Sequence, residues 1–382
     1  MLDDLETAST GVAELDVALG GLFWGDNVVW EIEEGSSVEP FLAAIAARAA
    51  EDYERAAYVT VGRDPGEVHE RFPGLEVIDA RPGTSLAEPG ALLGEIRKLC
   101  TSVERGLLLF DPLEAMGAAW GADTALRFFT RGCPMLLELG AIAYWSFAPG
   151  ELGQSSRREI EEVTQCVITV GDGRLRIAKA EGRPFGVQGS VFRYRADGGA
   201  PQLERAPAAA RLGSALRAVR LQRHLSQSEL ARLAGVSPSA VSQAERGQRG
   251  LSLETLLDLT ARLGITLDEL LRGEVAPGYR LARRHDPRQT ADGKPLPLLD
   301  DPETGLRAYL LRLPPKASSE LGFAHKGVEM VTVAAGLVQV VLATGRPVLR
   351  QGEALLAERD GIAGCRNIGD REALVFWVLR DG

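Results

Sequence analysis

The sequence contains few cysteines, no long apolar run and no internal repeat. Its four cysteines, Cys100, Cys133, Cys166 and Cys365, are scattered and form no CxxC pair. This spacing favours reduced thiols over a disulfide framework or a zinc site. No apolar run approaches the ~20 residues that span a bilayer. The acidic N-terminus, MLDDLETAST, lacks the basic and then apolar pattern of a secretory signal. We therefore expect a cytoplasmic protein without a membrane segment.

Length and composition predict a globular chain of two or three domains. The 382 residues exceed one ordinary core, and 45% of them are hydrophobic and 25% charged. The net charge of -10 disfavours a nucleic-acid partner, but residues 211–250 hold seven arginines against two glutamates. Phosphate binding depends on local charge, so this segment is compatible with DNA. A solvated helical surface would have the same composition, so charge alone leaves both interpretations open.

The pattern along the chain predicts three domains and a linker. In residues 1–195, helical stretches alternate with apolar β-rich runs, which predicts an α/β domain with a mainly parallel sheet. These runs are 27–32, 57–61, 106–110, 141–147 and 167–170. Residues 196–210, rich in Gly, Pro and Ala, are expected to be a linker, and 211–275 to be all-α. Residues 276–382 start with a loop-rich stretch and continue as short alternating strands, which predicts a small all-β barrel or sandwich.

Helix signals are concentrated in the middle region. Ser226 and Glu229 have the spacing of a capping box, and Gly235 follows at a C-cap position. Ser237 then supplies an N-cap, and Pro238 suits the first helical position. These signals predict two short helices joined by the residues AGVS, which is helix-turn-helix spacing.

This region resembles the Cro/repressor family of helix-turn-helix proteins, also called the XRE family. The resemblance covers about sixty residues and is carried by LSQSELARLAGVSPSAVSQAERGQRGLSLETLLDLTARLGITLDELL. It implies that residues 238–246 form a recognition helix in the major groove of double-stranded DNA. A helical domain that binds protein through the same face is the alternative.

The resemblance also implies roles for individual residues. Gln227 would bind a phosphate through its side chain and the helix terminus. Ser239, Ser242 and Gln243 would face the bases, because glutamine can bond adenine N6 and N7 together. Arg246 and Arg249 would hold phosphates. The expected DNA-binding residues are therefore Gln227, Ser237, Ser239, Ser242, Gln243, Arg246 and Arg249.

The N-terminal region resembles RecA-fold ATPases of the KaiC type over about 185 residues. The pairs Thr10-Gly11, Leu15-Asp16 and Gly20-Gly21 match the opening of that family, and EEVTQCVITVGDGRLRIAKAEGRPF resembles its closing strands. Asp111, at the end of the run LLLFD, stands where the family binds magnesium. The resemblance implies a RecA-like α/β fold.

The phosphate loop of that family is degenerate here. The motif G-x-x-x-x-G-K-[ST] cradles phosphates with backbone N–H groups and a lysine. In this chain Glu33 and Val38 stand at the glycines, Glu39 at the lysine and Pro40 at the hydroxyl residue. Glutamates would repel a triphosphate here, and Gly62 and Arg63 stand where KaiC-like proteins carry catalytic glutamates. The repelling residues are Glu31, Glu33, Glu34 and Glu39. We therefore expect a pseudo-ATPase domain that senses another ligand or assembles subunits.

The C-terminal region resembles the two motifs of small cupin barrels. A metal-binding cupin uses H-x-H and a glutamate in the first motif and a histidine in the second. His325 and Glu329 fit, but Phe323 and Ala363 replace the other two ligands. We therefore expect no metal, and His325 is interpreted as a pocket or core histidine. A cupin barrel without metal can still bind a small-molecule effector or pair subunits.

Together these observations predict a transcription regulator with a degenerate RecA-like domain, a helix-turn-helix domain and a degenerate cupin domain. We expect no catalytic residues, cofactor or metal, and we expect binding to DNA as a homodimer or higher homo-oligomer. The alternatives are an active ATPase or cupin enzyme fused to a DNA-binding domain, and a scaffold that organises chromosomal DNA.

Overall fold

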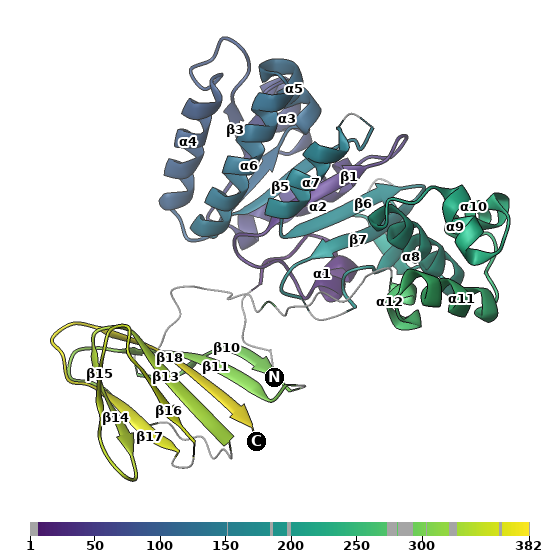
Figure 1. The fold of residues 1–382 in the computed structure, drawn as a ribbon. Coiled ribbons are helices and arrows are strands. Elements are labelled where there is room, and N and C mark those ends of the chain that lie inside the picture. The colour runs from purple at the N-terminus through teal and green to yellow at the C-terminus, as the bar shows by residue number, and fades with distance from the viewer. Residues whose placement is uncertain are drawn as a thin grey trace. The chain divides into compact units, whose positions relative to one another are not determined.

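The computed structural model describes residues 7–150, 152–183, 186–196, 200–272, 281, 293–302, 304–320, 327–358 and 361–381. The chain forms two compact units, Met1–Leu281 and Ala282–Gly382, which are described separately (Figure 1). In the described residues, no helix is long and apolar enough to cross a membrane.

A nine-stranded mixed sheet forms the centre of the first unit. Its strand order is β3-β2-β4-β5-β1-β6-β7-β8-β9. The strands from β3 to β6 are parallel: β1 (Asn27–Ile32), β2 (Arg55–Thr60), β3 (Glu76–Asp79), β4 (Gly106–Phe110), β5 (Ile142–Phe147) and β6 (Cys166–Gly171). The remaining strands continue antiparallel: β7 (Arg174–Ala180), β8 (Val191–Arg195) and β9 (Gln202–Arg205). The predicted α/β domain with a mainly parallel sheet is confirmed.

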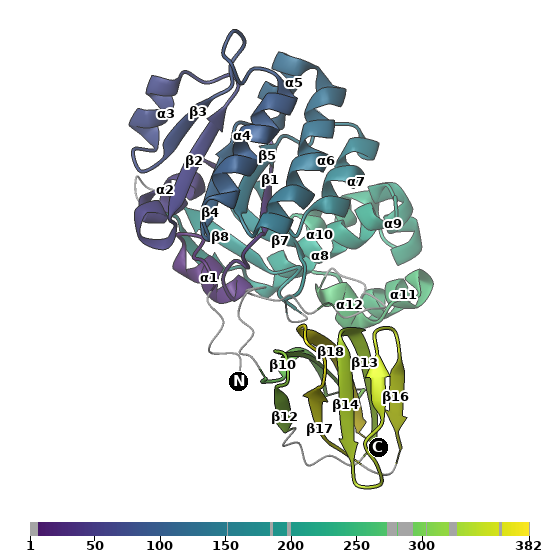
Figure 2. The same cartoon turned by 90° about the vertical axis from the view of Figure 1, so that its left-hand side faces the viewer.

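Helices cover both faces of the parallel part of this sheet. On one face lie α1 (Ala13–Leu19), α2 (Glu39–Asp52) and α3 (Pro65–Arg71). On the other lie α4 (Pro89–Thr101), α5 (Leu113–Trp120), α6 (Ala122–Leu139) and α7 (Gln154–Val163), which Figures 1 and 2 show together. Side chains alternate between the two cores, so Val28 and Trp30 pack under α1–α3 while Val29 packs under α4–α7.

The segment expected to be a linker is largely structured. Its described residues include β9, which pairs with β8, and α8 (Ala208–Gln222) begins three residues after β9 ends. Val191 on β8 forms a small buried cluster with Ala206 and Ala210. The composition of 196–210 suggests a loop, but antiparallel pairing with the preceding strand β8 makes part of it sheet. The helical region is therefore attached directly to the edge of the sheet.

Five helices form the described part of the predicted all-α region. They are α8, α9 (Gln227–Ala234), α10 (Pro238–Glu245), α11 (Leu253–Leu263) and α12 (Leu267–Arg272). Their core includes Leu216, Val219, Leu230, Val241 and Leu259, all nearly inaccessible to solvent. Helix α8 packs closely on α10, because a Cβ at Gly213 would lie 2.3 Å from the carbonyl oxygen of Ala244.

The second unit consists of antiparallel strands, as expected. One sheet has the order β10-β11-β18-β13-β16 and the other β12-β17-β14-β15. The strands are β10 (Leu296–Asp301), β11 (Leu306–Leu313), β12 (Ser318–Glu320), β13 (Gly327–Ala335), β14 (Leu337–Leu342), β15 (Val348–Arg350), β16 (Ala354–Ala357), β17 (Ile362–Asn367) and β18 (Ala373–Asp381). Alternate residues such as Val331, Val333, Val338 and Val375 form its core.

Candidate nucleic-acid interface

The ends of α9 and α10 are held by the caps that the sequence predicts. The Glu229 backbone N–H donates to Ser226 Oγ at 3.2 Å, and the Ser226 backbone N–H donates to Glu229 Oε2 at 2.8 Å. Gly235 ends α9 with a φ of 67°, a conformation that favours glycine. Ser237 then caps α10 by accepting the N–H of Ala240 at 3.2 Å. The turn between the helices is therefore fixed at both ends.

A buried carboxylate ties together the three helices around this turn. Glu245, at the end of α10, is only 6% exposed. Arg220 of α8 donates from Nε to Glu245 Oε1 at 2.6 Å and from Nη2 to Oε2 at 3.2 Å. Gln227 of α9 donates from Nε2 to Glu245 Oε2 at 2.8 Å. Because the pair is bidentate and further hydrogen-bonded, it constrains the angle between α9 and α10.

Gln227 therefore has a structural partner as well as its expected phosphate role. Its amide nitrogen carries two hydrogens, and the bond to Glu245 uses one of them. The side chain is half-buried at the first turn of α9, where backbone N–H groups have no helical partners. The predicted phosphate contact at Gln227 is compatible with this geometry.

The residues expected to contact DNA lie on the solvent side of α10 and the loop that follows it. Ser237, Ser239, Arg246 and Arg249 are exposed, while Ser242 and Gln243 are half-buried. The Gln243 side chain has no hydrogen-bond partner in the described part of the chain. Arg246 donates from Nε to the carbonyl oxygen of Ser242 at 3.2 Å. The structure thus brings these six residues together along one helix and its exit, and their roles stay predictions.

In the described residues, two polar contacts add to the small apolar cluster of Val191 and Ala210 in joining the helical region to the α/β part of the first unit. Arg174 of β7 donates from Nη2 to the carbonyl oxygen of Arg246 at 3.0 Å. Arg217 of α8 forms an ion pair with Glu33, with Nη2 3.1 Å from Oε1. Glu33 is one of the residues that replace phosphate-loop glycines. The degenerate loop therefore contacts the helical region through this ion pair.

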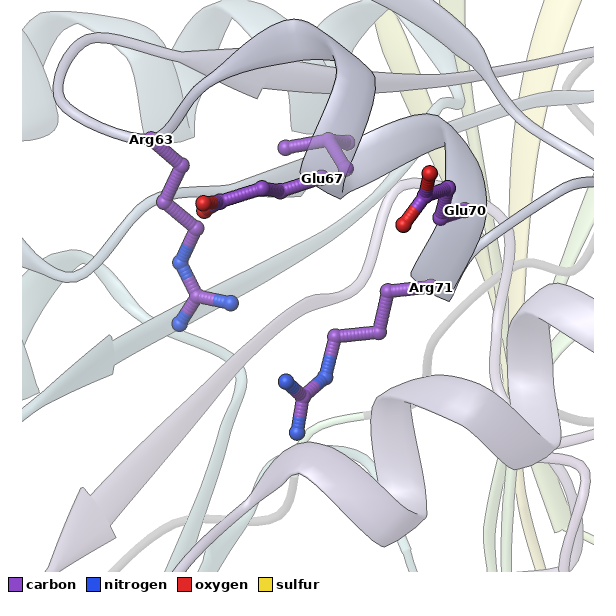
Figure 3. A pocket seen from close by; sticks show the side chains of 5 residues that line it. Arg63, Glu67, Glu70 and Arg71 are labelled. Carbon is purple, nitrogen blue, oxygen red and sulfur yellow. The ribbon is translucent and has the colours of Figure 1, made fainter.

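At the lysine position of the degenerate loop, the structure places an ion-paired acid. Glu39, at the start of α2, pairs with Arg63 at 2.9 Å and also with Arg71 of α3. Arg63, Arg71 and two glutamates of α3 line a cavity of about 510 Å³, shown in Figure 3. The sign of the charge is reversed relative to a P-loop, since an acid stands at the lysine position and an arginine stands opposite it.

Asp111, expected at the magnesium position, is fully buried and extensively hydrogen-bonded. Its Oδ2 accepts the backbone N–H of Val61 and Gly62, both at 2.9 Å, and the Thr60 hydroxyl at 3.0 Å. Its Oδ1 accepts the hydroxyl of Tyr58 at 2.9 Å. Burial and the nearby carboxylate raise the pKa of Tyr58, so this hydroxyl remains a donor. The carboxylate is therefore already used to hold the turn after β2.

In the second unit, two of the four expected ligand positions can be described, Glu329 and Ala363. Glu329 is buried on β13, where Oε2 accepts the indole N–H of Trp377 at 3.0 Å and Oε1 accepts the Ile362 N–H at 3.3 Å. Ala363 lies on β17, whereas Phe323 and His325 fall outside the described residues. No group of three or more metal-ligating side chains occurs within the described ranges.

Comparison with known proteins gives one family assignment. Residues 216–270 match the HTH_3 model, whose description is helix-turn-helix. These residues, which cover most of α8 to α12, form a helix-turn-helix domain of the kind that binds DNA. No curated protein matches the chain.

Several solved structures are similar to parts of the chain. A KaiC-like protein from Pyrococcus horikoshii is 16% identical with a TM-score of 0.43, over 52% of this chain and 99% of that one. An HTH_3 family transcriptional regulator from Vibrio cholerae is 20% identical with a TM-score of 0.21, over 46% and 97%. The Cupin_2 domain of an XRE family transcriptional regulator from Enterobacter cloacae is 21% identical with a TM-score of 0.22, over 23% and 96%.

Sequence reasoning missed the partners that hold the site together. Glu245 follows Val241 and Ala244 on the buried side of α10, so helical periodicity places an acid among core residues. A buried acid needs a cation or hydrogen-bond donors around it. The pattern does not show that the partner is Arg220, twenty-five residues earlier.

Proposed function

We propose that this chain is a cytoplasmic, sequence-specific transcription regulator that binds double-stranded DNA as a homodimer or higher homo-oligomer. One observation carries the proposal: on α10 Ser239 is exposed and Ser242 and Gln243 are partly accessible, while the opposite side of the helix is fixed by the buried Glu245. A recognition helix needs both properties, because base contacts require side chains presented in a defined orientation.

The proposed contacts divide into base reading and phosphate binding. Gln243 reads a base edge, with adenine as its preferred partner, and Ser239 and Ser242 add contacts beside it. Gln227, Arg246 and Arg249 bind phosphates and fix the register of α10 in the groove. The α/β domain and the second unit serve oligomerisation or effector sensing, by favouring one arrangement of the DNA-binding domains.

The test begins with selection of bound fragments from genomic DNA by the purified full-length chain. A regulator enriches a few discrete sites, whereas a chromosome scaffold covers many. On the enriched site, Gln243→Ala is expected to lower affinity by roughly 1–3 kcal/mol and to relax selectivity at one base position. The matched control is Gln222→Ala, which removes an exposed glutamine at the end of α8. Unchanged selectivity in Gln243→Ala would show that α10 is not the reading helix.

We also propose that the α/β domain does not hydrolyse ATP. The support is electrostatic: Glu39 occupies the lysine position with two arginine partners, and Asp111 is enclosed by hydrogen bonds. Binding a magnesium triphosphate would require both networks to break. An ATPase assay on the full chain, together with metal analysis of the purified protein, tests this proposal against the enzyme alternative.

A further inference from the structure

The antiparallel strands β7, β8 and β9 carry charged side chains on one face. The register pairs Arg174 with Arg193, Arg193 with Glu204, and Arg195 with Gln202. The residues that alternate with them belong to the core of the first unit: Leu175, Phe192 and Leu203. Because successive side chains point to opposite faces of a strand, the charged set lies on the face away from that core.

This charged face is hollowed and predominantly basic. A cavity of about 260 Å³ is lined by Arg174, Arg193 and Arg195, together with the carboxylates Asp172 and Glu204. Arg193 and Arg195 are exposed, and among the described residues neither forms an ion pair. The two outer guanidinium groups are therefore available to an anion.

The basic face continues into the proposed DNA-reading surface. Arg174 bonds the carbonyl oxygen of Arg246, the residue that ends α10. At Gly247 the backbone turns with a φ of 66°, and a Cβ there would lie 2.7 Å from the Cα of Ala210 in α8. These contacts fix the end of the recognition helix against the edge of the sheet. Arg246, which is exposed and lies next to Arg174, thus extends the same positive surface.

We infer that this face of β7–β9 binds the sugar-phosphate backbone of the same DNA duplex, on the flank beside the C-terminal end of α10. The inference rests on the proposed function, because it assigns a second contact to that DNA. Guanidinium groups suit phosphodiesters, since their planar donors match phosphate oxygens. Asp172 and Glu204 lower the local charge, so the face suits one or two phosphodiester groups better than a triphosphate.

The salt dependence of DNA binding tests this inference. Affinity of the full chain for a mixed-sequence 40-bp duplex is measured by fluorescence anisotropy over a range of NaCl concentrations. Each phosphate that the protein binds contributes ~0.9 to the slope of log K against log salt. The double variant Arg193→Ala/Arg195→Ala should therefore reduce the slope by about 1–2. At ~0.1 M salt it should bind roughly eightfold more weakly for each phosphate that it no longer neutralises.

Two further variants make the result specific. Arg193→Lys/Arg195→Lys keeps both charges and should keep the slope within about 0.5 of the parent value. Arg97→Ala/Arg131→Ala removes the same charge from exposed positions on α4 and α6 and should leave the slope unchanged. An unchanged slope in Arg193→Ala/Arg195→Ala, with a parent chain that binds DNA, overturns this inference alone. A parent chain that does not bind the duplex overturns the proposed function as well.

Discussion

Removal of the Arg220 side chain should destabilise the helix-turn-helix more than any surface change in it. The Arg220 and Glu245 side chains are 12% and 4% exposed, so Arg220→Ala leaves a carboxylate buried without its cation. Removing one partner of such a pair costs about 3–5 kcal/mol. The hydrogen bond from Gln227, which stabilises the carboxylate by about 1.5–3 kcal/mol, is present with or without Arg220. Because the buried carboxylate keeps this donor, it is not left entirely unpaired. We therefore expect the free energy of unfolding of this region to fall by an amount near the lower limit, about 3 kcal/mol.

Hydrogen exchange of the full chain, followed by mass spectrometry, measures this loss locally. A chain with several domains has no single unfolding transition, so a global melting curve would mix their contributions. Peptides that cover 212–245 should exchange about a hundredfold faster in Arg220→Ala, since 1.4 kcal/mol corresponds to a factor of ten. Peptides from β1 to β6 should be unaffected.

Two comparisons isolate the buried pair. Arg217→Ala makes the same change on the same helix, but Arg217 is half exposed and pairs with the partly exposed Glu33. This variant should therefore lower the local free energy of unfolding by less than about 1 kcal/mol. The double variant Arg220→Met/Glu245→Leu removes both charges and should recover most of the lost protection. If Arg220→Ala exchanged no faster than Arg217→Ala, the assignment of Glu245 as the link between α8, α9 and α10 would be wrong.

Three further predictions concern the rest of the chain. Calorimetry with magnesium should detect no saturable ATP binding at micromolar concentration. Glu39→Lys should not create ATP binding, and it should lower the stability of the α/β domain by about 1 kcal/mol, because the new lysine repels Arg63 and Arg71. Footprinting and analytical ultracentrifugation should show a dimer or higher oligomer on a two-fold symmetric site with half-sites about one helical turn apart; a monomer on one half-site would refute this. Burial raises the pKa of the Glu31 carboxyl on β1, which Arg157 only partly offsets. The neutral form is then favoured in the folded state, and stability is lost as pH rises through the folded pKa. Glu31→Gln should accordingly raise the hydrogen-exchange protection of peptides from β1 at pH 7, by an amount that shrinks towards acidic pH.

Local signals in the sequence were enough to locate the helix-turn-helix and most of the parallel strands. The bounds of β1 and β4 were predicted correctly: β4 is a continuous apolar run, as a fully buried parallel strand usually is, and β1 is built around the apolar residues Val28 to Trp30. The caps at Ser226 and Ser237 are equally local, since each depends on residues three apart. These features need no knowledge of the rest of the fold.

Features that depend on distant partners could not be predicted in this way. The strand β3 has the sequence EVID, which is short and half acidic, and only its pairing with β2 makes it a strand. The strand β9 was missed for another reason: it pairs with the preceding strand β8, but it lies in a segment whose composition suggests a loop. The buried pair Arg183–Asp26, with side chains 0% and 1% exposed, joins residues 157 positions apart. The sequence around Asp26 does not indicate Arg183 as its partner, and the sequence around Arg183 does not indicate Asp26.

The replacement of the phosphate loop and the attachment of the helix-turn-helix are connected by one residue. Glu33, which stands at a glycine position of the loop, pairs with Arg217 on α8, and Arg174 holds the end of α10. A loop that closed on a triphosphate would have to change conformation, and Glu33 would move with it. Because this loop contacts the helix-turn-helix region instead, a fixed loop conformation keeps α8 and α10 in place, which a nucleotide-responsive loop would not. The acidic loop is thus consistent with a domain that holds α8 and α10 in place at the edge of its sheet.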